Sequence, residues 1–299
     1  MISQSGKVVN INNANGDLRA KSCLFVNNLE SGRAKNRKKV DICDVEALFD
    51  HPVSVVAFDG TQDIDGYPLV LVCGGDGTIS NAVNAIHSSS GLLYLPSGTV
   101  NDFGKIKRKE DAPLIVGRAN EKRFCYVLAT GTFTSIGYDT KRKYKKRIGK
   151  LAYLIRAIKE FRIQRIKGII KADGKSIEGE FTLVMILRSP RCFGFSFNKM
   201  YRDEPELYLL TISSPKRNGI IGLAELFFLF FRSFFIGFRK EKDGKIKFLP
   251  CKDVTFNFDG SADFCLDGEK YVAENEVKCF AETTPIELKI LKKIKRSRG

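Results

Sequence analysis

Residues 74–78, with the sequence Gly-Gly-Asp-Gly-Thr, combine the residue types expected where a protein holds a phosphate group. The apolar run at residues 69–73 is short and rich in β-branched side chains, which is typical of a strand buried on both faces. After the glycines, apolar residues recur at helical spacing, at Ile79, Ala82, Val83 and Ile86. A strand, a glycine turn and a helix direct backbone N–H groups toward one point, which suits a phosphate.

Asp76 lies inside this glycine turn, where its carboxylate would repel a phosphate unless a cation lies between them. The turn therefore predicts a nucleotide bound with Mg²⁺ and not a bare anion. We expect the glycines to be needed because glycine reaches positive φ without steric cost. The alternative is an ordinary βα turn, because glycine turns are common in α/β proteins.

A second polar loop, residues 96–104, directly follows an apolar run at residues 92–95 that we expect to be a strand. Its hydroxyl, amide and carboxylate groups can offer phosphate donors and a cation ligand. Alone, the loop would be read as a polar turn with Asn101 or Asp102 as an N-cap. Because ligands bind at the carboxyl ends of parallel strands, we expect both loops at one edge of a sheet, and the pair favours the functional interpretation.

The elements around these loops predict two domains in the chain of 299 residues, of which 43% are hydrophobic. Strands interleaved with helical stretches predict an α/β nucleotide-binding domain with a parallel sheet over residues 1–123. Short segments with alternating polarity predict a mainly antiparallel β-domain over residues 124–285. These predicted strands are residues 166–172, 180–187, 206–212, 254–258, 278–281 and 286–290.

The two loops together resemble the diacylglycerol kinase catalytic-domain family, which includes bacterial diacylglycerol kinases and their sphingosine and ceramide kinase relatives. The GGDGT turn alone is also similar to that of NAD kinases. Residues 28–32 resemble the family's N-P-x-S-G loop, with Leu29 in place of proline, and residues 149–153 and 266–269 match later motifs. The resemblance, which runs from about residue 22 to residue 290, implies a β-sandwich second domain and a tail, about 286–299, that returns to the first domain.

The resemblance also implies ATP and Mg²⁺ as cofactors and assigns roles to individual residues. Nucleotide contacts are expected from Asn28, Ser31, Gly32, Gly74, Gly75, Asp76, Gly77, Thr78, Ser80, Gly98, Thr99, Asn101 and Asp102. Asp76 and Asp102 are the expected ligands of the catalytic Mg²⁺. The catalytic carboxylate falls in the motif at residues 267–269, where Glu269 is favoured and Asp267 is its neighbour or exchange candidate. In a strand both would point to one face; without the resemblance, the motif would be read as a hairpin turn.

The net charge of +16 predicts an anionic partner, such as a membrane surface, a phosphorylated substrate or a nucleic acid. Residues 220–238 contain seven phenylalanines and only three polar interruptions. We expect a helix there that is either mostly buried against the β-domain or presents phenylalanines to an acyl chain or the membrane interface. Both can hold if the helix covers a lipid pocket. A transmembrane span is not favoured, because the segment is short and carries two charges.

These features predict a lipid kinase that transfers the ATP γ-phosphate to a lipid hydroxyl, with diacylglycerol as the favoured substrate. The N-terminus lacks the signal-peptide pattern and the eight cysteines form no CxxC pair, so we expect a cytoplasmic protein peripheral at an anionic membrane. One alternative is an NAD kinase-like enzyme. Another is a catalytically weak lipid- or nucleic-acid-binding protein, because Ser80 and Asn81 replace the family's usual Asn-Glu pair. A homodimer is left open.

Overall fold

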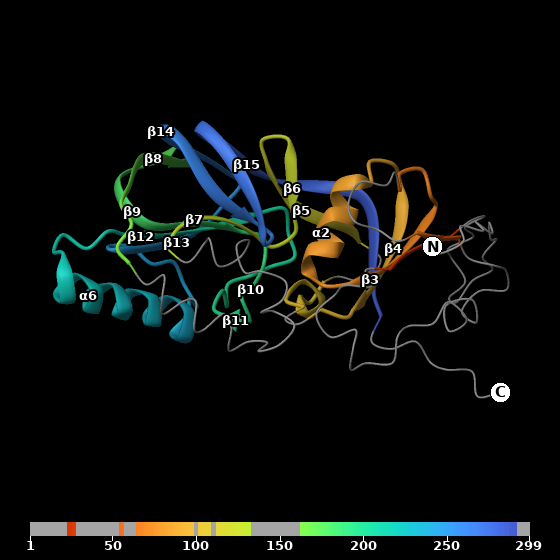
Figure 1. Ribbon diagram of the computed structural model, residues 1–299, viewed down its shortest axis with the longest axis horizontal. Helices are drawn as coiled ribbons and strands as arrows, with labels where there is room; N and C mark the ends of the chain where they lie inside the picture. The colour runs from red at the N-terminus through yellow and green to blue at the C-terminus, as the bar shows by residue number, and fades with distance from the viewer. Residues whose placement is uncertain are drawn as a thin grey trace, which may run out of the picture. The chain divides into compact units, whose positions relative to one another are not determined.

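The computed structural model describes residues 23–27, 54–56, 64–98, 101–108, 112–132 and 162–291, the first two segments by their backbone alone (Figure 1). The chain divides into two compact units. The first comprises residues 1–104, 108–114 and 284–299, and the second comprises residues 105–107 and 115–283.

The first unit is built on a run of parallel strand pairs. The strands are β2 (Ser54–Val56), β1 (Cys23–Asn27), β3 (Leu69–Gly74), β4 (Ser90–Pro96) and the end of β15 (Glu269–Ile290), paired in that order. Every residue of β3 is buried, as its continuous apolar sequence predicts. The pairing of β4 with residues 286–290 places the last part of β15 in this unit.

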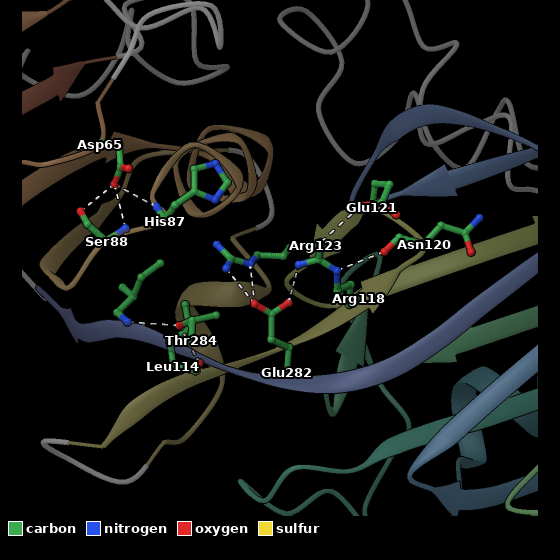
Figure 2. Close-up of polar contacts among 11 residues, drawn as sticks. Asp65, His87, Ser88, Leu114, Arg118, Asn120, Glu121, Arg123, Glu282 and Thr284 are labelled. Atoms are coloured by element: carbon green, nitrogen blue, oxygen red, sulfur yellow. Dashed lines mark hydrogen bonds and ion pairs between the residues drawn. The ribbon is translucent and has the colours of Figure 1, made fainter.

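Helix α2 (Asp76–Ala85) connects β3 to β4 and confirms the helical spacing of its apolar residues. The side chains of Ile79, Ala82 and Val83 are fully buried. A short 3₁₀ helix, η1 (Phe103–Lys105), follows the second polar loop. Asp65 lies ahead of β3 and accepts hydrogen bonds from the backbone N–H groups of His87 and Ser88, which follow α2 (Figure 2). The hydroxyl and backbone N–H of Ser88 and the backbone N–H of His87 hold the pKa of the Asp65 carboxyl below its usual value.

The second unit is predominantly an antiparallel β-structure. Its elements are β5 (Pro113–Ala119), β6 (Lys122–Phe124), β7 (Val127–Gly131), β8 (Ile166–Ala172), β9 (Lys175–Leu187), β10 (Arg191–Cys192), β11 (Phe195–Ser196), β12 (Leu207–Ser213), α6 (Gly219–Phe231), the π-helix η2 (Arg232–Ile236), β13 (Ile246–Cys251), β14 (Asp253–Leu266) and the first part of β15. The strand order β13-β12-β9-β7-β14-β15 is antiparallel throughout. β8 pairs with β9 and β14, and these strands enclose a core of aliphatic and aromatic side chains that includes Phe181, Phe256 and Phe264.

Two details of the predicted organisation differ from the structure. The predicted strands at residues 278–281 and 286–290 are one continuous strand, β15, which runs through Pro285. Residues 115–123 group with the second unit and not with the first, because the strands they form pair with β15 and with each other. The alternation of polar and apolar residues does not reveal such partners, since strand pairing joins residues far apart in the sequence.

Glu282 on β15 forms the centre of a partly buried ion-pair cluster in the second unit (Figure 2). Its two carboxylate oxygens pair with Arg123 at 2.7 Å and with Arg118 at 3.0 Å. Burial raises the pKa of the Glu282 carboxyl, but the hydrogen bonds and charges of Arg123 and Arg118 outweigh burial, so this pKa lies below its usual value.

We expect Glu282→Gln to lower the free energy of unfolding by about 1–3 kcal/mol at neutral pH, because two arginines lose their charged partner. Because the pKa of Glu282 is lower in the folded protein, its ionised carboxylate stabilises the fold at a pH above its pKa in the unfolded chain, about 4.3. This stabilisation is lost as the pH falls through the pKa of the folded protein. Denaturant titrations at neutral and acidic pH should therefore show a difference from wild type that disappears in acid. The control is Glu276→Gln, because Glu276 on the same strand forms an exposed pair with Lys278. Equal losses in both variants would contradict a special role for the cluster.

Candidate functional site

The glycine turn and the second polar loop lie next to each other because β3 and β4 are parallel neighbours. Gly74 and Pro96 are paired at the ends of these two strands. The backbone N–H of Ser97 donates to the carbonyl oxygen of Gly74 at 2.8 Å, which joins the beginnings of both loops. Strand pairing thus brings the two loops to one edge of the first unit, where parallel sheets bind ligands.

Gly75 and Gly98 approach each other closely through their backbones, and neither has positive φ. Gly75 has φ −92° and ψ −173°, so the expectation of positive φ is wrong at this position. A Cβ atom on Gly98 would lie 2.5 Å from Cα of Gly75 and 2.7 Å from Oδ1 of Asn101. A Cβ atom on Gly74 would lie 2.5 Å from the side chain of Thr78. The two loops therefore pack backbone against backbone, and a larger residue at Gly98 would separate them.

Asp76 connects the two loops through its carboxylate. Oδ2 accepts the backbone N–H of Asp102 at 2.9 Å, and Oδ1 accepts the backbone N–H of Phe103 at 3.0 Å. Asp76 is also the first residue of α2, where the partial positive charge of the helix N-terminus favours a carboxylate. These contacts give the carboxylate of Asp76 a favourable environment within the fold.

The side chain of Asn101 contains a buried oxygen that accepts no hydrogen bond from the described residues. Its backbone has φ 52°, and its Nδ2 atom donates to the carbonyl oxygen of Gly98 at 2.9 Å. The buried Oδ1 atom has no hydrogen-bond partner among the described residues. An oxygen acceptor of this kind fits a hard cation such as Mg²⁺ or a donor group of a ligand.

The other predicted nucleotide contacts have different environments. Thr78, Ser80 and Asp102 are buried in the first unit, so their side chains contribute to packing around the loops. A contact of Asp102 with Mg²⁺ stays a prediction, and the described residues contain no cluster of three or more His, Cys, Asp or Glu side chains suited to a metal. Four predicted contacts lie outside the described residues: Asn28, Ser31, Gly32 and Thr99.

The motif at residues 267–269 is a hairpin turn in the second unit. Leu266 pairs with Glu269, and the two residues between them, Asp267 and Gly268, have φ 50° and φ 94°. Two central residues with positive φ are the signature of a type I′ turn, so the expectation that both carboxylates point to one face of a strand is wrong.

The two carboxylates of this turn consequently differ in environment. Asp267 is 2% exposed and accepts the backbone N–H groups of Cys125, Tyr126 and Val127, the last two at 3.0 Å. Glu269 is exposed at the start of β15. Asp267 therefore fixes the beginning of β7, whereas the carboxylate of Glu269 is accessible to a substrate.

Arg108 is a cation at the second loop that the sequence motifs do not indicate. Its guanidinium lies 4.0 Å from the centre of the Phe103 ring, and Nη1 donates to the carbonyl oxygen of Phe103 at 3.1 Å. Arg108 thereby holds η1 in position. Arginines are frequent throughout this basic chain, so only the tertiary contact distinguishes this one.

Comparisons with known proteins support the resemblance carried by these loops. Residues 21–109 match the family model of the diacylglycerol kinase catalytic domain, which confirms the predicted resemblance over this segment. The chain is 28% identical over 149 residues to a diacylglycerol kinase of Staphylococcus carnosus, with 44% of this chain and 49% of the relative covered. A diacylglycerol kinase of Bacillus subtilis is 28% identical over 148 residues, with coverages of 43% and 49%. The chain spans about half the length of the curated relatives it matches.

Solved structures extend the similarity of fold beyond the matched segment. A provisionally assigned diacylglycerol kinase from Bacillus anthracis superposes with a TM-score of 0.66 and 17% identity, with 89% of this chain and 96% of that chain covered. A second crystal structure, of a diacylglycerol kinase from the same organism, has a TM-score of 0.59 with coverages of 89% and 95%. At this identity the comparison shows a shared fold over most of the chain.

Proposed function

We propose that this chain, whose residues 21–109 belong to the diacylglycerol kinase catalytic-domain family, is a lipid kinase that transfers the γ-phosphate of ATP to a lipid hydroxyl. Diacylglycerol is the substrate we favour, because the matched relatives are named for it. The observation that carries the proposal is the pair of loops joined by the Gly75–Gly98 contact and by the Asp76 carboxylate.

Phosphoryl transfer needs positioning and charge neutralisation more than covalent chemistry from the protein. In the first unit, the N-terminus of α2 is the candidate source of N–H donors for the ATP phosphates. Asn101 Oδ1 is a candidate Mg²⁺ ligand because this buried oxygen has no hydrogen-bond partner among the described residues. It would join the predicted ligands Asp76 and Asp102. Bound Mg²⁺ supplies positive charge that neutralises the phosphate oxygens during transfer.

The acceptor hydroxyl also needs a base, and Glu269 is the residue we assign to this role. Its exposed carboxylate can accept a proton from a lipid hydroxyl. Asp267 is bound by three backbone N–H groups, and accepting a proton would weaken those bonds. We therefore assign Asp267 to positioning the turn that carries Glu269. We further propose that the protein acts in the cytoplasm, peripherally at a membrane.

The direct test is to incubate the purified chain with labelled ATP and Mg²⁺, with mixed micelles of diacylglycerol or, separately, with NAD. We expect label in the lipid fraction alone, and its loss when a chelator removes Mg²⁺. Label in NADP would support an NAD kinase instead. ATP binding without transfer to any acceptor would support a catalytically weak lipid-binding member of the fold. Either outcome would overturn the proposed activity.

A further inference from the structure

The apolar segment formed by α6 and η2 packs one narrow side against the second unit. Its buried residues are Gly222, Leu226, Phe230 and Ser233. A Cβ atom on Gly222 would lie 2.8 Å from Ile163, so glycine allows the helix to approach closely. The ring of Phe234 contacts those of Phe195 and Phe197, with centroid distances of 6.2 and 5.0 Å. The interpretation that the helix is mostly buried is nevertheless wrong, because only 22% of residues 219–236 is buried in the protein.

The opposite side of the same segment is apolar and faces outward. Ile220 is 85% exposed, Phe228 67% and Phe235 65%. The exposed positions 220, 224, 228, 231 and 235 recur three or four residues apart and so form one stripe along the helix. Within it, the rings of Phe231 and Phe235 stack at 5.1 Å. Soluble monomers seldom expose so continuous an apolar surface, which usually marks an interaction site.

The two charged residues within the segment are both engaged by the protein. Glu225 forms an ion pair of 2.7 Å with Lys245. Arg232 donates from Nη1 to the carbonyl oxygen of Gly237 at 2.6 Å, and its guanidinium lies 5.4 Å from the centre of the Phe238 ring. Neither charged side chain therefore interrupts the apolar surface of the exposed stripe.

Basic residues flank both ends of the segment. Lys216 and Arg217 precede α6, and Arg239, Lys240 and Lys242 follow η2, all of them exposed. Two acidic residues lie in the same stretch: Glu241, which is exposed, and Asp243, which forms an ion pair with Lys247. An apolar stripe with exposed lysines and arginines at both ends is complementary to a surface of anionic headgroups above acyl chains.

We propose that the outward stripe of α6 and η2, residues 220–236, docks this protein in the plane of a bilayer that contains anionic lipids. The segment of 18 residues has a mean hydropathy of 1.9, enough for a membrane span, but 22% of it is buried in the protein. Both ends are also fixed to the second unit, because Lys199 Nζ donates to the carbonyl oxygen of Ile236 and Gly222 packs on Ile163. A helix that lies in the plane of the bilayer buries both of its apolar sides, because the inner side packs on the protein and the outer side enters the lipid. Figure 1 shows α6 in teal along the lower side of the second unit.

Because the chain contains no tryptophan, Phe228→Trp introduces a single fluorescent reporter on the stripe. We expect vesicles of phosphatidylcholine and phosphatidylglycerol to shift its emission to the blue. Lipids brominated at different acyl positions should quench it most strongly about 5–10 Å below the headgroups, the depth of an interfacial helix. The matched control is Phe280→Trp, because Phe280 is 45% exposed on β15, away from the helix. Emission that does not change at residue 228, or changes equally at residue 280, would overturn the proposal.

Vesicle sedimentation measures the contribution of each part of the surface. We expect the double variant Phe228→Gln, Phe235→Gln to bind at least about tenfold more weakly, because two aromatic side chains no longer enter the lipid. Phe280→Gln should bind like wild type. Lys216→Gln combined with Arg217→Gln should weaken binding to anionic vesicles by about tenfold or more, and should change binding to neutral vesicles little.

The alternative occupant of the stripe is a second copy of the chain. A dimer in analytical ultracentrifugation that dissociates in the Phe228→Gln, Phe235→Gln variant, without vesicle binding by wild type, would assign the stripe to self-association and overturn membrane docking. Strongest quenching at the bilayer centre would indicate a transmembrane span instead.

The inference deepens the proposed function, but vesicle binding needs no ATP. Binding without phosphorylation of any lipid would reject the kinase proposal alone, whereas phosphorylation of a soluble short-chain diacylglycerol without binding would reject docking alone.

Discussion

Glu269→Gln is expected to lower the rate of lipid phosphorylation by about 10²–10⁴-fold, the usual contribution of a general base. Glutamine has nearly the shape of glutamate but cannot accept the proton of the attacking hydroxyl. Glu269 is exposed at the start of β15, so we expect thermal unfolding and ATP affinity to remain those of wild type. The measurements are the turnover rate with micellar diacylglycerol and the melting temperature of the same preparation.

Glu274→Gln is the matched control, because Glu274 is exposed on the same strand. It should retain full activity. Asp267→Asn should behave differently from both, since three backbone N–H groups at residues 125–127 would lose a charged acceptor. We expect it to lower the free energy of unfolding by about 2–4 kcal/mol, as hydrogen bonds to a charged group are strong and buried donors are costly to leave unpaired. A stable Asp267→Asn protein without activity, beside an active Glu269→Gln protein, would reverse the two assignments.

Asp76→Asn is expected to weaken ATP binding by about tenfold or more and to slow phosphoryl transfer further, because the carboxylate holds the second loop against α2. Asparagine can accept one N–H through its oxygen, but its NH₂ group would face the other donor. Either Asp102 or Phe103 would then lose its backbone hydrogen bond. Isothermal titration with ATP and Mg²⁺, together with turnover, would measure both effects.

The control for this variant is Asp65→Asn, because Asp65 is another carboxylate of the first unit that accepts backbone N–H groups. Its partners His87 and Ser88 lie outside the two loops, so a loss of stability there should leave ATP affinity unchanged. If both variants bind ATP equally well, the link between the loops is not needed for the nucleotide. If both bind equally poorly, general destabilisation explains the effect.

The sequence by itself determined the local elements and the family that residues 21–109 resemble. The apolar run before the glycines is the buried strand β3, and the spacing of Ile79, Ala82 and Val83 is that of helix α2. Strand β8 has the predicted bounds. The two loop motifs sufficed to find the resemblance to the family whose model matches residues 21–109. These features depend on residues close in the sequence, where periodicity and motif spacing carry the information.

Only the tertiary structure decided which contacts the individual site residues make. In the sequence, Asp76 and Gly98 look like ligand-binding residues. In the structure, Asp76 also accepts the hydrogen bonds that join the two loops, and Gly98 makes the close contact between them. Asp267 and Glu269 are carboxylates of one motif in which the resemblance favours Glu269, and a turn with positive φ buries the first and exposes the second. The phenylalanine helix was consistent with either a buried or an exposed face, and the structure shows both. Each of these distinctions depends on partners far along the chain, whose positions follow from strand pairing and packing and leave no local pattern.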